Sequence, residues 1–111
     1  MGGFIKGEVV TVPFPFSDLS QSKFRPALVV TKLGGDDLIV CMITSQASNN
    51  DIYKISLTAN DFTDGKLKEN SYIRPNRLFT ADSNIIVKKK GKISITKQTE
   101  VISKIIEIIQ S

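Results

Sequence analysis

The sequence contains no histidine and no tryptophan, and its single cysteine is Cys41. Without histidine the chain lacks the usual general base of serine and cysteine hydrolases and a common ligand of zinc sites. One cysteine cannot form an internal disulfide, and Cys41 lies in an apolar run, so we expect a buried, unreactive thiol. The carboxylates show no recognisable metal-ligand spacing. We therefore expect no metal and no other cofactor.

Long apolar segments are also lacking. No run approaches the roughly 18 residues of a membrane helix, and no apolar segment with a cleavage site occurs near the amino terminus. We therefore expect a cytoplasmic protein with no membrane contact. A length of 111 residues is typical of one domain, so residues 1–111 are predicted to form a single domain.

The charge balance is basic. Lysine and arginine number 15 against 11 aspartate and glutamate residues, for a formal net charge of +4. This balance favours an anionic partner, either nucleic acid or an acidic protein.

Short β-branched segments separated by glycine, proline and polar residues indicate strands that pair mostly antiparallel. Gly34-Gly35 predicts a tight hairpin turn, because such turns need positive φ values that glycine reaches at little cost. We expect a short helical turn that ends at Gly65. The lysine-rich residues 88–92 indicate a solvated turn, with RNA contact by Lys88, Lys89, Lys90 and Lys92 as the alternative. The expected strands cover residues 7–13, 26–32, 38–45, 53–57, 71–74, 77–80 and 85–87.

The carboxyl-terminal segment changes to helical spacing. Isoleucine and valine recur at i, i+3, i+4 and i+7 from Val101 to Ile109, which predicts a helix from about Lys97 to Gln110 with Thr96 as its N-cap. Together the elements predict a mainly β fold, a small antiparallel SH3-like barrel or strongly curled sheet, with a C-terminal helix packed on it.

Arg25 precedes Pro26 at the start of a predicted strand, so its backbone should be extended. In an antiparallel hairpin the start of one strand lies opposite the end of the next, and Arg25 should therefore share an end of the hairpin with Thr44. Functional groups often lie at such strand ends beside a loop. Alternatively, Arg25 pairs with Asp18 or Glu8 and only fixes the loop.

The residue types that remain for chemistry are arginine, lysine, hydroxyls and amides, which suit phosphate binding. RNA supplies its own nucleophile, the 2′-hydroxyl, so a protein that cleaves RNA need only align it and stabilise the charge of the transition state. Arginine is a poor base at neutral pH but a good charge stabiliser or proton donor.

Several motifs in order and spacing resemble those of the MazF/PemK family of toxin endoribonucleases. They are Gly7-Glu8-Val9-Val10, Pro13 to Leu19, Arg25 to Val30, Ile43-Thr44-Ser45, Ser71 to Arg74, Leu78-Phe79-Thr80 and Gly91-Lys92-Ile93. The resemblance implies a homodimeric barrel, metal-independent cleavage of single-stranded RNA, and inhibition by a cognate antitoxin protein.

The same resemblance implies that Arg25 and Thr44 are the catalytic pair and that the loop from Ser17 to Lys23 contacts RNA. Many relatives carry a glutamate in this loop, where the present chain reads Leu19-Ser20-Gln21, so its cleavage-site preference is left open. The RNA-binding candidates are Phe16, Ser17, Asp18, Ser20, Gln21, Lys23, Ser45, Gln46, Arg74 and Arg77.

Some of these candidates also have structural interpretations. Ser45 and Gln46 can cap a loop, Arg74 and Arg77 can belong to a solvated edge strand, and Phe16 can be part of the core.

The predicted function is that of a type II toxin that cuts messenger RNA at a short sequence to 2′,3′-cyclic phosphate and 5′-hydroxyl ends. A non-catalytic SH3-like module that binds nucleic acid is the alternative. A CcdB-like gyrase inhibitor ranks last, because such toxins use a tryptophan near the carboxyl terminus and this chain has none.

Overall fold

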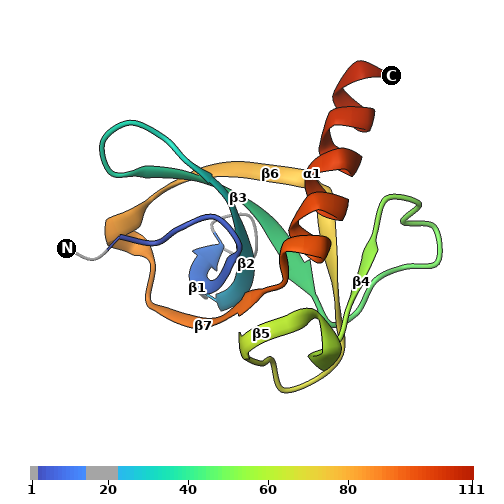
Figure 1. The fold of residues 1–111 in the computed structure, drawn as a ribbon, viewed down its shortest axis with the longest axis horizontal. Helices are drawn as coiled ribbons and strands as arrows, with labels where there is room; N and C mark the ends of the chain where they lie inside the picture. Colours follow the sequence, from blue (N-terminus) through green and yellow to red (C-terminus); the bar gives the residue numbers. More distant parts are fainter. Residues whose placement is uncertain (1–2, 15–22) are drawn as a thin grey trace.

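The chain folds as one curled antiparallel sheet with a helix beside it (Figure 1). The computed structural model describes residues 3–14 and 23–111. Within those residues the sheet has seven strands in the order β4-β6-β3-β2-β1-β7-β5. The elements are β1 (Glu8–Phe14), β2 (Lys23–Lys32), β3 (Asp37–Thr44), β4 (Ile55–Leu57), β5 (Phe62–Gly65), β6 (Ser71–Asp82), β7 (Lys88–Ile93) and α1 (Ile95–Gln110). The predicted mainly β fold with a C-terminal helix is confirmed.

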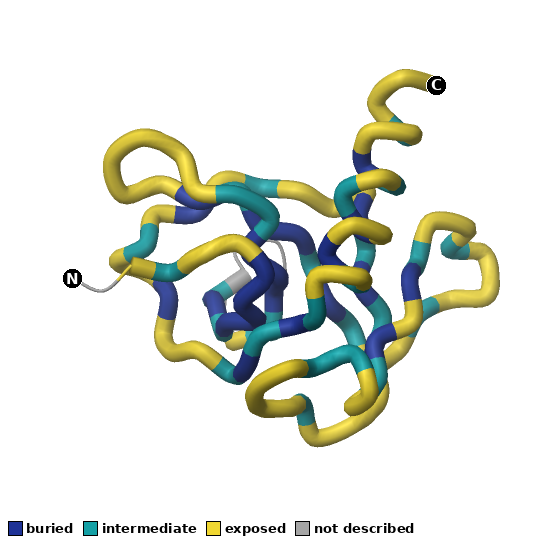
Figure 2. The backbone as a smooth tube through the Cα atoms, viewed as in Figure 1, coloured by how far each residue is buried: buried dark blue, intermediate teal, exposed yellow. Residues whose placement is uncertain are grey.

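Both faces of the central strands are buried, as the dark segments of Figure 2 show. Val9 and Val10 are fully buried neighbours that point to opposite faces, because side chains alternate along a strand. Val9 packs with Val101 of α1 in one cluster, and Val10 packs with Val40 in the other. Each fully buried aliphatic side chain contributes about 1.5–3 kcal/mol, so these two layers account for much of the stability of the sheet.

The hairpin at Gly34-Gly35 forms as predicted, and it fixes the register of β2 against β3. Gly35 has a positive φ of 74°, and Leu33 N–H donates to the carbonyl of Asp37 at 2.9 Å across the turn. From there the strands run antiparallel to the pair Ala27 and Met42.

The predicted N-cap of the helix is wrong. The side chain of Ser94 accepts a hydrogen bond from Lys97 N–H at 3.1 Å, so the helix begins at Ile95 and Thr96 lies inside it. The expected apolar stripe packs only in part: Val101 and Ile105 are buried, whereas Ile106 and Ile109 are 48% and 71% exposed.

The two short strands expected on either side of Pro75 form one strand, β6. Its pairing with β3 shifts from Met42 opposite Arg74 to Cys41 opposite Leu78, so Pro75 lies in an irregularity of the ladder. A bulge tolerates proline because the missing N–H has no ladder partner to lose. Strand continuity here comes from the partner β3 rather than from local propensity.

The segments around residues 58–65 and 85–92 also differ from expectation. The helical turn covers only Ala59–Asp61, and the residues up to Gly65 form β5. The prediction of a strand at residues 85–87 is wrong. Ser83–Ile85 forms a 3₁₀ helix that is capped by the side chain of Asp82, and residues 86 and 87 belong to no strand. The lysine-rich segment that we expected to be a turn is strand β7, paired with β1 and β5.

The expected strand over residues 53–57 covers only Ile55–Leu57. No helix in the described part of the chain has the length and apolar character needed to cross a membrane.

Candidate functional site

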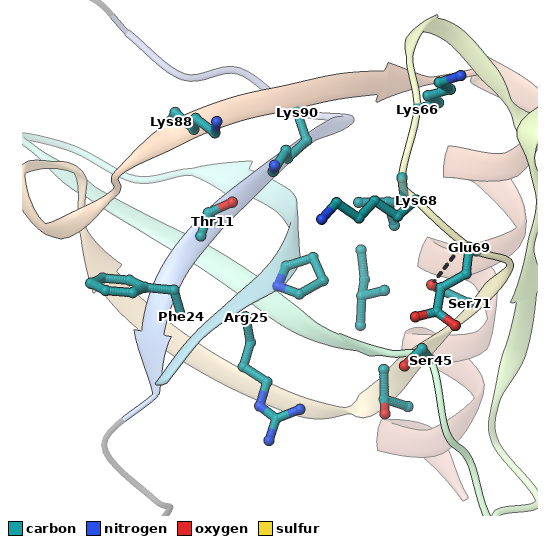
Figure 3. A pocket seen from close by; sticks show the side chains of 14 residues that line it. Thr11, Phe24, Arg25, Ser45, Lys66, Lys68, Glu69, Ser71, Lys88 and Lys90 are labelled. Carbon is teal, nitrogen blue, oxygen red and sulfur yellow. Dashed lines mark hydrogen bonds between the residues drawn. The ribbon is translucent and has the colours of Figure 1, made fainter. Parts of the chain in front are cut away.

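A groove of about 430 Å³ lies at the end of the β2–β3 hairpin (Figure 3). β1, β2 and β3 form its floor, and β7 and the connection between β5 and β6 form its walls. Its lining residues are Thr11, Phe24, Arg25, Pro26, Ile43, Thr44, Ser45, Lys66, Leu67, Lys68, Glu69, Ser71, Lys88 and Lys90.

Arg25 and Thr44 both line this groove. Ala27 of β2 pairs with Met42 of β3. Because the two strands are antiparallel, two residues further toward the open end of the hairpin Arg25 lies opposite Thr44. The prediction that these two residues share one end of the hairpin is confirmed.

Arg25 is partly exposed, and its guanidinium extends away from the lysine side chains of the groove (Figure 3). Of the two carboxylates proposed as its partners, Glu8 instead pairs with Lys89 at 3.2 Å, and Asp18 lies outside the described residues. In residues 3–14 and 23–111, Arg25 forms no ion pair. Its planar donors are therefore available to a phosphate in this part of the structure.

The Thr44 hydroxyl is oriented by the backbone of the loop that follows β3. It accepts a hydrogen bond from Gln46 N–H and donates one to the Gln46 carbonyl, both at 3.1 Å. This pair of bonds holds the hydroxyl at the end of β3, beside Ser45 in the groove.

The groove is strongly basic. Arg25 and four lysines line it against one carboxylate, that of Glu69. Among the residues that the structure describes, no group of three or more histidine, cysteine, aspartate or glutamate side chains could hold a metal ion. The charged groups of this site suit a polyanion, because each cation can meet one phosphate oxygen as a point charge or a fork.

The other predicted RNA-binding residues divide into three groups. Ser45 lines the groove, and Gln46 meets Thr44 through its backbone. Arg74 and Arg77 do not line it. Phe16, Ser17, Asp18, Ser20 and Gln21, together with the side chain of Lys23, lie outside the described residues.

Arg74 has a structural partner. Its Nε lies 2.9 Å from Oδ2 of Asp51, whose side chain is only 6% exposed. The interpretation as a solvated edge strand is wrong for Arg74, because β6 lies between β3 and β4. Arg77 is exposed, at the irregularity where β6 changes register.

Several lining residues were not among the RNA-binding candidates, although RNA contact was the alternative interpretation for the lysines of residues 88–92. Phe24 is 59% exposed beside Arg25, and an aromatic residue directly before an arginine in the sequence is the signal that could have identified it. Lys66 and Lys68 lie on the connection from β5 to β6, and Lys88 and Lys90 lie on β7. Their meeting depends on the pairing of β5 with β7, for which the sequence carries no local signal.

The fold agrees with comparisons to known proteins. Residues 5–109 match the family described as PemK-like, MazF-like toxin of type II toxin-antitoxin system. The chain therefore belongs to this family of toxins.

Solved structures show the same fold at low sequence identity. MazF from Deinococcus radiodurans (Form-I) is 18% identical, with all of both chains covered and a TM-score of 0.77. An endoribonuclease in complex with its cognate antitoxin, from a mycobacterial species, is 10% identical over 97% of this chain and 96% of its own, with a TM-score of 0.75. The Mycobacterium tuberculosis toxin MazF-mt6 is 13% identical over 93% of this chain and 96% of its own, with a TM-score of 0.71. No curated protein matches the chain.

Proposed function

We propose that this toxin is a metal-independent endoribonuclease that cuts single-stranded RNA, with Arg25 and Thr44 as its catalytic pair. The observation that carries the proposal is their position together in a groove whose charged lining is almost entirely basic. The similar mycobacterial structure described as an endoribonuclease supports the reaction class. In this proposal residues 1–111 act as one toxin domain in the cytoplasm, where messenger RNA is present.

The reaction needs no nucleophile from the protein. The RNA 2′-oxygen loses its proton to water and forms a bond to the adjacent phosphorus, and the bond from phosphorus to the 5′-oxygen breaks. The 5′-oxygen leaves as a hydroxyl after it gains a proton from solvent, so the products carry a 2′,3′-cyclic phosphate and a 5′-hydroxyl.

Arg25 and Thr44 have separate roles in this scheme. The Arg25 guanidinium donates to the phosphate oxygens and stabilises the charge that grows on them in the transition state. The Thr44 hydroxyl, held by Gln46, aligns the phosphate for in-line attack. Such preorganised donors each supply about 10²- to 10³-fold in rate.

The partners follow from the family. One of the similar structures is MazE-MazF from Deinococcus radiodurans, and by analogy this toxin is inhibited by a cognate antitoxin. The basic groove suits an acidic antitoxin segment that competes with RNA. The toxin acts as a homodimer, as the family resemblance implies.

The decisive experiment is cleavage of a mixed RNA in EDTA, with the new ends mapped by sequencing. We expect cyclic phosphate and 5′-hydroxyl ends at a recurring short sequence, and no cleavage of a DNA strand of that sequence, because it lacks the 2′-hydroxyl.

Cleavage should be lost in Arg25→Ala and Thr44→Val and retained in a Lys6→Ala control that lies outside the groove. Full activity in both groove variants would refute the assignment of the pair. RNA binding by the unaltered protein without any fragments would instead indicate a non-catalytic module.

A further inference from the structure

The three consecutive lysines of β7 have different surroundings. Lys89 lies 3.2 Å from Glu8 and 3.4 Å from Asp64, so two carboxylates compensate its charge. Its hydrogen bond to Glu8, followed by the charge attraction between them, raises the pKa of Lys89 above its ordinary value. Lys88 and Lys90 line the groove and form no ion pair within the described ranges.

A register shift contributes to this arrangement. Val9 of β1 pairs with Gly91, and the next residue, Val10, pairs with Lys89, so Lys90 is the extra residue of a bulge. Bulges commonly redirect a side chain. Lys89 is anchored by the carboxylates while Lys88 and Lys90 remain on the groove side.

A second pair of groove lysines, Lys66 and Lys68, lies on the connection between β5 and β6. Leu67 packs against the core cluster, and its two neighbours, Lys66 and Lys68, line the groove. Figure 3 shows Lys88 and Lys90 on one wall and the side chain of Lys68 extending toward them from the other. Leu67 is partly buried, and it holds Lys68 opposite Lys88 and Lys90, whereas the side chain of Lys66 extends away from them (Figure 3).

The groove thus has two separate basic regions. Arg25, which shares an end of the hairpin with Thr44, extends away from the lysines (Figure 3). One phosphate bound at Arg25 would leave four lysines in the groove with only the carboxylate of Glu69 to compensate their charges. Lysine ammonium groups act as flexible point charges that hold phosphates without reading bases.

We propose that Lys66, Lys68, Lys88 and Lys90 form a second phosphate-binding subsite, which holds the RNA backbone next to the phosphate bound at Arg25. The inference deepens the proposed function and rests on it. The subsite supplies binding common to all sequences, so it acts on the affinity for RNA and not on the chemical step.

The test uses Arg25→Ala protein, which is expected to leave RNA intact, and a fluorescein-labelled single-stranded RNA of random sequence. Binding is measured by fluorescence anisotropy between about 50 and 200 mM salt. Two double variants, K88Q/K90Q and K66Q/K68Q, are compared with K6Q/K32Q, which removes the same charge from exposed lysines that do not line the groove.

We expect each groove double variant to weaken RNA binding about tenfold and to lower the salt slope by about 0.7 for each phosphate that the variant no longer neutralises. The K6Q/K32Q control should change the affinity for RNA and the salt slope much less. In protein with Arg25 present, K88Q/K90Q should raise KM and leave kcat nearly unchanged. Thermal melts show whether each variant is folded. The two pairs of groove lysines lie on different elements, so if one double variant does not fold, the other still tests the subsite.

The outcomes separate the two proposals. Equal effects of groove and control variants, with RNA still bound, would overturn the subsite and leave the nuclease assignment intact. A loss confined to kcat would also overturn it. The proposed function, and the subsite with it, would be overturned if the unaltered protein did not cleave RNA and the Arg25→Ala protein, with all its lysines present, did not bind it.

Discussion

The hydroxyl of Thr44 and the backbone of Gln46 form two reciprocal hydrogen bonds of 3.1 Å each. The hydroxyl accepts from the Gln46 N–H and donates to the Gln46 carbonyl. The first bond fixes the position of the oxygen, and the second can be exchanged for a phosphate oxygen without moving the backbone. Thr44 is thus presented to the groove by a loop residue two positions further along the chain.

This geometry predicts different outcomes for two substitutions of Thr44. Thr44→Ser keeps the hydroxyl, so cleavage should remain within about tenfold of the original rate. Thr44→Val keeps the shape and removes the hydroxyl, and kcat should fall about 10²- to 10³-fold. Single-turnover cleavage under saturating enzyme measures the step directly. A large loss in Thr44→Ser, with activity retained in Thr44→Val, would show that the methyl packing, and not the hydroxyl, is what matters.

For Arg74 we predict a structural role that predominates over RNA contact. Its partner Asp51 is nearly buried, so Arg74→Gln leaves a carboxylate without its ion pair and should lower the free energy of unfolding by about 1–3 kcal/mol. Urea unfolding measures this loss. The double variant Arg74→Gln with Asp51→Asn should recover part of it, while KM for RNA stays near its original value. A large rise in KM in the stable double variant would show that Arg74 contacts RNA.

The ion pair of Lys89 predicts a pH dependence of stability. The pKa of Lys89 is raised in the folded state by its hydrogen bond to Glu8, so the folded protein holds this proton more tightly than the unfolded chain does. The resulting stabilisation is fully present below about pH 10.5, the ordinary value, and is lost as pH rises through the raised pKa.

The measurement compares urea midpoints of the original protein and Lys89→Gln across this range. The difference between them should be largest below about pH 10 and should shrink above it. A difference that grows with pH would contradict the role of this ion pair.

Cys41 is predicted to be inert in the folded protein. Its side chain is fully buried, and burial raises the pKa of the thiol to about 12. Because the thiolate is the reactive species, iodoacetamide at about pH 8 should modify Cys41 very slowly in buffer and rapidly in urea. Mass spectrometry of the timed reaction measures both rates. Fast labelling of folded protein would show that β3 opens readily or that the thiol is accessible.

The sequence was most informative where short segments decide their own geometry. Gly34-Gly35 predicted the hairpin, and the hairpin alone was sufficient to place Arg25 near Thr44. The same local reasoning was wrong where two structures compete. Ser94 and Thr96 are both good N-caps, and Pro75 predicted a break that the neighbouring strand β3 overrides.

By itself, the sequence determined the mainly β character of the chain, its hairpin, its terminal helix, and the absence of histidine chemistry. Side-chain periodicity and turn propensity are local properties, and so they can be read in order along the chain. Only the tertiary structure decided that Lys66 and Lys68 line the same groove as Lys88 and Lys90, and that Arg74 pairs with Asp51. Those contacts join distant segments, and their register depends on how β5, β6 and β7 pack into the curled sheet rather than on any propensity of the segments themselves.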